Sequence, residues 1–179
     1  MSTLYVDNLQ PNLGSQVAIP NLKPLAGSVV SVHNAISSAA HAINSAGLVN
    51  VTGLSITFTP KSANNLIVME AVIQNTRTYV TSYAFLKNGA LTAPATNSNN
   101  TSVTNSQLTL YKALGTADLS QTHATPLMHY EVAGDTNSRT YTVACTSSWG
   151  SSGYTMYVNN RSNNDMGAYS YFRIMEIAQ

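Results

Sequence analysis

The stretch Leu66-Ile-Val-Met-Glu-Ala-Val-Ile-Gln74 decides the fold. Read as a strand, it carries apolar side chains on both of its faces: Leu66, Val68 and Val72 on one, and Ile67, Met69, Ala71 and Ile73 on the other. A strand of this kind is covered on both faces. The stretch therefore predicts a central strand in a layered β protein.

Seven further segments after Leu48 alternate or are rich in apolar residues, and turn signals separate them. With the first stretch, the expected strands are Leu54–Thr59, Leu66–Gln74, Tyr79–Lys87, Gln107–Lys112, Leu127–Val132, Arg139–Thr146, Tyr154–Asn159 and Ala168–Ala178. Asn88-Gly89 is a strong hairpin turn signal. About eight antiparallel strands in roughly 130 residues predict an all-β, jelly-roll-like β-sandwich over residues 48–179. An immunoglobulin-like sandwich is the alternative.

Residues 1–27 differ from the rest of the chain. Leu4 and Val6 alternate with polar neighbours, as do Val17 and Ile19, and three prolines interrupt the segment. Proline breaks helices and central strands, so the sequence predicts an extended arm with one or two short strands. Such an arm becomes ordered by lying on its own domain, a neighbouring subunit or a docking surface. The alternative is a flexible tail.

Residues 28–47 connect the arm to the sandwich. Ser28–His33 predicts a short strand, and Asn34–Gly47 is the one helix candidate. Asn34 could serve as its N-cap and Gly47 as its terminator. Its apolar face would consist of Ile36, Ala40 and Ile43.

Charge is scarce in this chain. Charged residues make up 8% of it, against about 25% in a typical soluble domain, and the net charge is +1. An uncharged hydrogen-bonding surface tolerates close packing against another protein, so the composition favours an assembly over a monomer with a neutral surface. The sequence has no basic block for nucleic acid or anionic membrane and no apolar run of about 18 residues. Residues 1–7 lack the features of a signal peptide, and a lone cysteine, Cys145, suits a reducing cytosol.

The last predicted strand, Ala168–Ala178, is also apolar on both faces. A strand of a monomeric sandwich leaves one face to water, so two such strands in one sheet would leave an outer face that needs a partner. Aromatic residues, Met and Arg are enriched at interfaces. We therefore expect a homo-oligomer; the alternative is that loops or residues 1–47 cover these faces. The predicted interface residues are Tyr169, Tyr171, Arg173, Met175, Ile177, Ile67 and Met69.

The spacing of chemically active residues does not indicate a catalytic or cofactor site. Glu70, Glu131 and Glu176 lie in predicted strands and could converge as an acid–base pair, although pairing with arginine (Arg77, Arg139 or Arg173) is the simpler account. His123 and His129 flank Pro126 and could line one loop, but they lack the spacing of a metal motif. Cys145 alternates with Val143 and Tyr141, which predicts a core position. Neither a catalytic residue nor a metal or cofactor is therefore expected.

A tryptophan in a Gly/Ser-rich turn is the one candidate for ligand contact. Trp149 and Tyr154, with the amides of residues 159–164 nearby, could form a glycan-binding surface. The alternative is that Trp149 anchors its own turn.

Several short motifs spread over most of the chain resemble tail-fibre-like and other virion proteins of cyanobacterial and marine phages. The motifs are Ser2-Thr-Leu-Tyr-Val-Asp-Asn-Leu9, Gly14-Ser-Gln-Val-Ala-Ile-Pro20, Thr57-Phe-Thr-Pro-Lys-Ser-Ala-Asn-Asn-Leu-Ile-Val68, His129-Tyr-Glu-Val-Ala-Gly-Asp135, Arg139-Thr-Tyr-Thr-Val143, Tyr157-Val-Asn-Asn-Arg161 and Ile174-Met-Glu-Ile-Ala178. The resemblance implies a trimeric β-sandwich displayed on a virion, with no catalytic residues.

An arm plus one compact domain is more typical of a capsid decoration (cement) protein than of a long fibre. The expected function is therefore a virion structural protein that is made in the host cytoplasm, binds the outside of the capsid through its arm and stabilises it. Its expected partners are itself and the major capsid protein or another virion protein. The alternative is a short tail fibre or receptor-binding tip that recognises a host glycan, and a glycan-cleaving enzyme is a third class.

Overall fold

The computed structural model describes residues 24–45, 47–77, 80–92, 108–111, 118–147, 155–160 and 167–179. These residues form eleven strands and no helix. The strands are β1 (Val29–Ser37), β2 (His41–Ile43), β3 (Val49–Phe58), β4 (Leu66–Arg77), β5 (Val80–Lys87), β6 (Ala90–Leu91), β7 (Leu108–Tyr111), β8 (Asp118–Val132), β9 (Arg139–Thr146), β10 (Met156–Val158) and β11 (Ser170–Ile177). All pairings are antiparallel.

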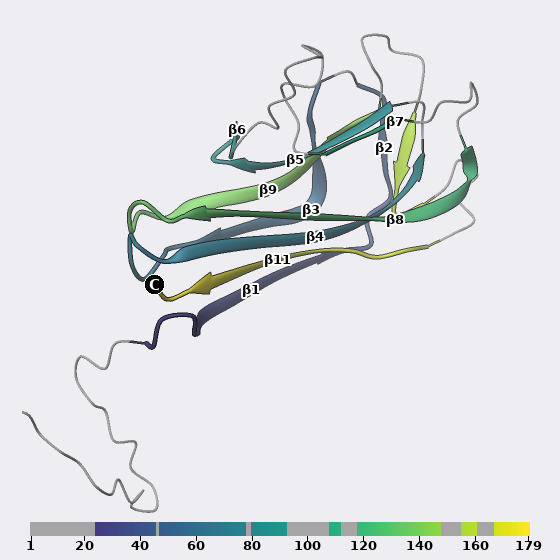
Figure 1. The fold of residues 1–179 in the computed structure, drawn as a ribbon. Helices are drawn as coiled ribbons and strands as arrows, with labels where there is room; N and C mark the ends of the chain where they lie inside the picture. Colours follow the sequence, from purple (N-terminus) through teal and green to yellow (C-terminus); the bar gives the residue numbers. More distant parts are fainter. Residues whose placement is uncertain are drawn as a thin grey trace, which may run out of the picture.

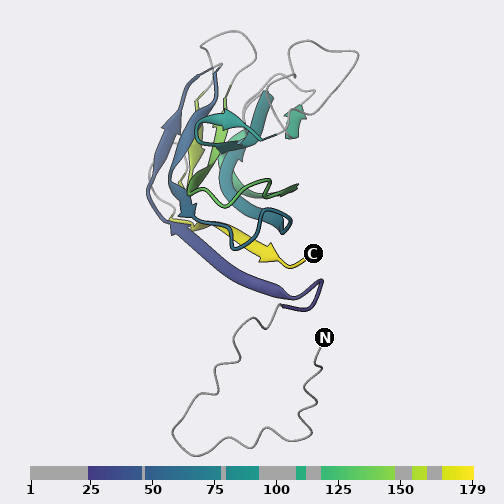
Figure 2. The same cartoon turned by 90° about the vertical axis from the view of Figure 1, so that its left-hand side faces the viewer.

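The strands form two sheets that pack as a β-sandwich, which confirms the expected fold class (Figures 1 and 2). The first sheet has the order β1-β11-β4-β10-β2, with β8 paired to β4. The second has the order β3-β9-β5-β6, with β7 paired to β5. Four pairs are nested along the chain, because β1–β11 encloses β3–β9, which encloses β4–β8, which encloses β5–β7.

The hydrophobic core lies between the two sheets. Phe85 of β5 and Phe172 of β11 stack across the sandwich with ring centroids 5.5 Å apart. Phe58 and Tyr141 stack within the second sheet at 5.8 Å. Burying an aliphatic or aromatic side chain of this size stabilises a fold by about 1.5–3 kcal/mol, so these rings hold the layers together. Cys145 is also fully buried in this core, as predicted.

The predicted helix over Asn34–Gly47 is wrong. Residues 34–37 belong to β1 and pair with β11, from Asn34↔Arg173 to Ser37↔Ser170. His41–Ile43 then forms β2. A helix starting at Asn34 would give up this ladder, and tertiary pairing of this kind overrides a weak local helix preference. The segment between the arm and residue 48 is therefore part of the first sheet rather than a linker.

A buried asparagine joins the ends of three strands. Asn159 has a positive φ of 59°, which asparagine tolerates better than most residues. Its side-chain amide donates to the carbonyl oxygens of Ser37 and Ala39 at 3.0 and 3.1 Å, and the Ser170 hydroxyl donates to its Oδ1 at 2.6 Å. Asn159 thereby fixes the end of β1 and the start of β11 against the end of β10.

The last residues of the predicted arm belong to the folded domain. Residues 24–28 form a turn in which the Ser28 N–H and hydroxyl both donate to the Leu25 carbonyl oxygen. The Gly27 N–H then donates to the Ala178 carbonyl oxygen at 2.7 Å, next to the end of β11. Residues 24–27, predicted as part of the arm, therefore belong to the folded domain and lie beside the C-terminus.

Gly53 is expected to be the least replaceable glycine of the described residues. It lies in β3 where the register with β9 shifts, its φ is +80°, and an added Cβ would lie 2.8 Å from Ser37 Oγ. We expect Gly53→Ala to lower the free energy of unfolding by about 2–4 kcal/mol, because left-handed strain adds to a steric clash. Urea denaturation measures this loss.

Gly89 provides the matched control. Its φ is +83°, but nothing lies within 4 Å of the position of an added Cβ. Gly89→Ala should therefore cost only the backbone strain of about 1–2 kcal/mol. Equal losses in the two variants would contradict the role given to the Ser37 contact.

Candidate functional site

Four strands of the first sheet turn an apolar face away from the core, here called the outer face. Opposite residues on adjacent strands share a face of a sheet, so the registers define its members. On β11 and β4 they are the pairs Tyr171 and Val72, Arg173 and Glu70, Met175 and Val68, and Ile177 and Leu66. On β8 they are Pro126, Met128, Tyr130 and Val132, opposite the same four β4 residues. On β1 they are Val32, Asn34 and Ile36.

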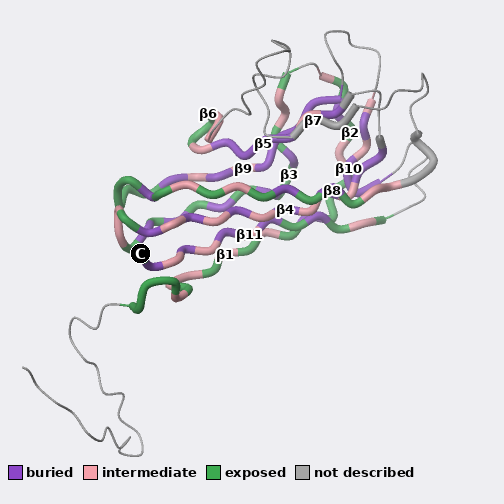
Figure 3. The backbone as a smooth tube through the Cα atoms, in the orientation of Figure 1, coloured by how far each residue is buried: buried purple, intermediate pink, exposed green. Residues whose placement is uncertain are grey.

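The outer face exposes several large apolar side chains. Six of its residues are between 38% and 70% exposed: Tyr171, Val32, Val132, Tyr130, Ile36 and Met128. Exposed positions alternate with half-buried ones along most of β1, and with buried or half-buried ones along β8 from residue 124 to 132 (Figure 3). These two strands form the edges of this face. Four rows on four strands cover roughly 500 Å² at ordinary strand spacing. The largest apolar patch on a typical monomer is of about this size and is often functional.

Five of the predicted interface residues are at least partly exposed in this part of the sheet. Tyr171, Arg173, Met175 and Ile177 belong to the outer face, and Tyr169, 71% exposed, immediately precedes β11. The structure therefore brings these residues together, as the alternation of the last strand predicted.

Ile67 and Met69 were wrongly assigned to this face. Both are fully buried, because Ile67 lies opposite Glu176 and Met69 opposite Ile174 on the core side of the sheet. The β4 residues on the outer face are instead Leu66, Val68, Glu70 and Val72. Glu70 was the signal that could have identified the exposed side, because the core side of the same strand carries no charge up to Ile73.

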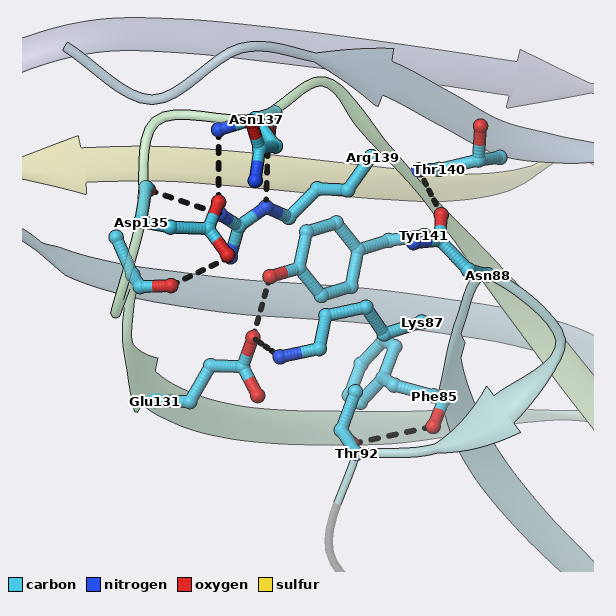
Figure 4. Close-up of polar contacts among 11 residues, drawn as sticks. Phe85, Lys87, Asn88, Thr92, Glu131, Asp135, Asn137, Arg139, Thr140 and Tyr141 are labelled. Carbon is cyan, nitrogen blue, oxygen red and sulfur yellow. Dashed lines mark hydrogen bonds and ion pairs between the residues drawn. The ribbon is translucent and has the colours of Figure 1, made fainter. Parts of the chain in front are cut away.

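A polar cluster links the two sheets beside the core (Figure 4). Lys87 of β5 and Tyr141 of β9 both donate to the carboxylate of Glu131 on β8, with a Lys87 Nζ to Oε1 distance of 2.9 Å. Glu131 is thus paired with a lysine and a tyrosine rather than with the arginine expected from the sequence. This arrangement bridges the sheets and satisfies the carboxylate.

Arg139 organises the turn between β8 and β9. Its guanidinium is buried and donates to the carbonyl oxygens of Ala133 at 2.6 Å, Asp135 at 2.9 Å and Asn137 at 3.3 Å, as well as to the Asp135 carboxylate (Figure 4). These contacts use the planar fork of donors that distinguishes arginine from lysine. The Arg139 side chain therefore has a structural role in holding this turn.

The three strand glutamates do not share a site. Glu131 on β8 and Glu176 on β11 lie opposite Ile67 on the two strands that flank β4. Glu70 lies on the other face of the sheet. Glu176 accepts hydrogen bonds from Ser31 Oγ, Lys61 N and Asn65 Nδ2, and Glu70 lies 3.9 Å from Arg173. Each carboxylate therefore has its own partners, and the described residues do not form the proposed acid–base pair.

His123 and His129 do not share a loop. Both lie in β8, six residues and so roughly 20 Å apart along the strand, which is too far for one metal ion. Burial lowers the pKa of His129, against the pull of the Glu131 carboxylate. The described part of the chain holds no cluster of three or more potential metal ligands, and no helix in it is long and apolar enough to cross a membrane.

The buried Tyr141 phenol predicts a loss of stability in alkali. Burial raises the pKa of Tyr141, and the hydrogen bond to Glu131 and its charge raise it further. An unfolded tyrosine ionises near pH 10, so the folded state is disfavoured as the pH rises above 10. We expect Tyr141→Phe to flatten this alkaline decline, measured as urea midpoints between pH 8 and 11.

The buried thiol of Cys145 contributes a separate part of the alkaline decline, and this part is the internal control. Burial raises the pKa of its thiol too, and an unfolded thiol ionises from about pH 9. Tyr141→Phe should therefore leave the decline between pH 9 and 10 unchanged and reduce only the part above pH 10. An unchanged slope above pH 10 would contradict the role given to the phenol.

The predicted arm contacts Leu4, Val6, Val17 and Ile19, and the predicted glycan contacts Trp149 and Tyr154, lie outside the described residues. Comparisons of the sequence with protein-family models and with curated proteins find no match. The outer face is therefore the feature of the described residues from which a function can be argued.

Proposed function

We propose that this protein is a capsid decoration protein whose copies associate through the outer face and bind the outside of a phage capsid. The observation that carries the proposal is the apolar outer face of β1, β11, β4 and β8, with six large side chains between 38% and 70% exposed. Covering such a surface is favourable by about 25 cal/mol per Å² of apolar area removed from water. Three copies in each assembly is what the resemblance to phage virion proteins implies.

The strand order supports a jelly roll. Three of the eleven strands have two or three residues, namely β2, β6 and β10. The other eight pair first with last, second with seventh, third with sixth and fourth with fifth. A long hairpin rolled around a barrel gives this nested order, and jelly rolls of eight strands are common in viral capsid proteins. The fold class by itself does not specify a function, so the binding experiment below carries the test.

The low charge supports an assembled state as well. Charged residues make up 8% of the chain, and the outer face carries two of them, Glu70 and Arg173, among its fifteen positions. Interface centres are depleted in charged residues and enriched in aromatic residues and methionine. The composition of the outer face matches that description.

The proposal is tested first in solution and then on particles. The purified full chain should sediment as an assembly of three 19.1 kDa chains, and a monomer would contradict the proposed association. Mixed with undecorated phage heads, it should bind at saturable stoichiometry and raise the temperature at which the heads break. Binding to host cells instead of heads would favour the receptor-binding alternative, and cleavage of polysaccharide would favour an enzyme.

The contribution of the arm is tested by truncation after residue 23. This cut leaves the turn of residues 24–28 and its bond to Ala178 intact. The shortened chain should keep its oligomeric state and lose binding to heads. Undiminished binding would contradict docking through the arm.

A further inference from the structure

We propose that Arg173 of one copy pairs with Glu70 of the next copy, and that this contact sets how copies align across the outer face. The inference rests on the proposed self-association and names the residues that give it specificity. Arg173 on β11 and Glu70 on β4 lie directly opposite each other in the sheet. They are one row from Tyr171 and Val72 on one side and one row from Met175 and Val68 on the other.

The two charges are only weakly engaged within one chain. Arg173 Nε and Glu70 Oε2 are 3.9 Å apart, whereas a charge-assisted hydrogen bond is about 2.7–2.9 Å long. Their side chains are 41% and 26% exposed. The guanidinium therefore keeps donors, and the carboxylate keeps acceptors, that face outward from the middle of the apolar surface.

Covering the outer face removes water from both groups. A charge that loses its water without a new partner costs several kcal/mol, so an occupant of this face must bring a carboxylate and a guanidinium of its own. Neighbouring copies of this chain carry both groups: in a ring of three copies, each Arg173 can meet the Glu70 of one neighbour and each Glu70 the Arg173 of the other. Each copy also carries the apolar rows that surround these charges, so two copies match in both charge and apolar contact.

The area and net charge of the outer face also favour another copy of this chain as its partner. Its area of roughly 500 Å² per copy approaches the 800 Å² or so that each partner contributes to a standard interface. The charges of Arg173 and Glu70 cancel, so the face has no excess charge to attract a nucleic acid or an anionic membrane. A neutral, apolar face with one charge of each sign is suited to contact with itself.

Disulfide trapping between two single-cysteine variants tests the pairing. A chain with Glu70→Cys is mixed with a chain carrying Arg173→Cys and oxidised. The mixture should give more linked species of two 19.1 kDa chains than either variant oxidised alone, because a disulfide requires Cα atoms about 4.4–6.8 Å apart. Each chain holds one new cysteine, so a link between positions 70 and 173 joins different copies. The native Cys145 is fully buried and does not compete.

A matched pair on the other sheet is the control. Thr57 of β3 and Thr140 of β9 also lie opposite each other on adjacent strands, with their hydroxyls 2.7 Å apart, on the face of the second sheet that is turned away from the core. A mixture of Thr57→Cys and Thr140→Cys chains should give no linked species above background. If both mixtures link to the same extent, the contact is random collision and the inference fails.

Charge reversal gives an independent readout. Glu70→Arg or Arg173→Glu alone should raise the dissociation constant of the assembly about tenfold or more, and the double reversal should restore it. If the unmodified chain assembles but neither reversal nor trapping has an effect, this pairing is wrong while self-association stands. If the unmodified chain is a monomer, the proposed self-association itself fails.

Discussion

Tyr130→Lys is expected to convert the assembly into folded 19.1 kDa monomers. Tyr130 lies on the outer face of β8, opposite Val68, and is 66% exposed in the single chain. A lysine at such an exposed position changes the free energy of unfolding by about 0.5 kcal/mol or less. In the covered interface, the same ammonium group would be buried among Val68, Met175 and Val32 without a carboxylate of its own. Removing an aromatic anchor and burying a charge should each cost about 2 kcal/mol or more.

Each of the two terms therefore raises the dissociation constant about thirtyfold, and together they raise it further. Sedimentation velocity over a range of concentrations measures it, and thermal unfolding followed by circular dichroism shows that the variant stays folded. Thr57→Lys, exposed on the second sheet, is the control and should leave the mass unchanged. A Tyr130→Lys variant that assembles like the unmodified chain would show that the outer face is not the contact surface.

Most of the strands could be predicted because they repeat with a period of two. Arg139–Thr146 matches β9 at both ends, and Asn88-Gly89 forms the expected hairpin turn between β5 and β6. β8 was predicted too short, since it begins at Asp118 within an expected loop. β8 includes Pro126, which is tolerated there because proline fits a strand with a free edge, and β8 pairs with β4 alone among the described strands.

Within β4, Glu70 was the single signal for which face is exposed. Both faces of the strand are otherwise apolar, so the rest of its pattern is compatible with either orientation. The register with β11 decides it, because Phe172 and Ile174 lie opposite Ala71 and Met69 in the core. That register depends on contacts between residues about a hundred positions apart, which no local pattern contains.

Buried amides and hydroxyls account for part of the polar composition. Asn75 receives a hydrogen bond from Thr125 Oγ1 at 3.0 Å, and Asn159 receives one from Ser170 Oγ at 2.6 Å. All four side chains are buried. Asn, Ser and Thr are abundant in this chain, and these contacts give some of them a role inside the fold. A neutral polar group needs fewer partners than a buried charge, so the chain can place many of them between strands.

Glu176 is, with Arg139, a buried charged residue among the described residues; its carboxylate is fully buried, and the sequence placed it on a strand without indicating its partners. Its Oε1 accepts from the Lys61 N–H at 2.6 Å and from Asn65 Nδ2 at 2.7 Å, and its Oε2 accepts from Ser31 Oγ at 3.2 Å. Lys61 and Asn65 lie in the segment between β3 and β4, which carries the chain from one sheet to the other. The carboxylate therefore holds this crossing against β11 and β1.

Glu176→Ala is accordingly expected to lower the free energy of unfolding by about 3–5 kcal/mol, because it leaves buried donors without an acceptor and opens a cavity. Urea denaturation of a variant kept monomeric by Tyr130→Lys separates this loss from any effect on assembly. Glu176→Gln is the matched control: its carbonyl oxygen can accept from Lys61 N and Asn65 Nδ2, and its amide can donate to Ser31 Oγ. That variant should lose about 1 kcal/mol. Equal losses in the two variants would mean that the negative charge, rather than satisfaction of the three donors, makes Glu176 necessary.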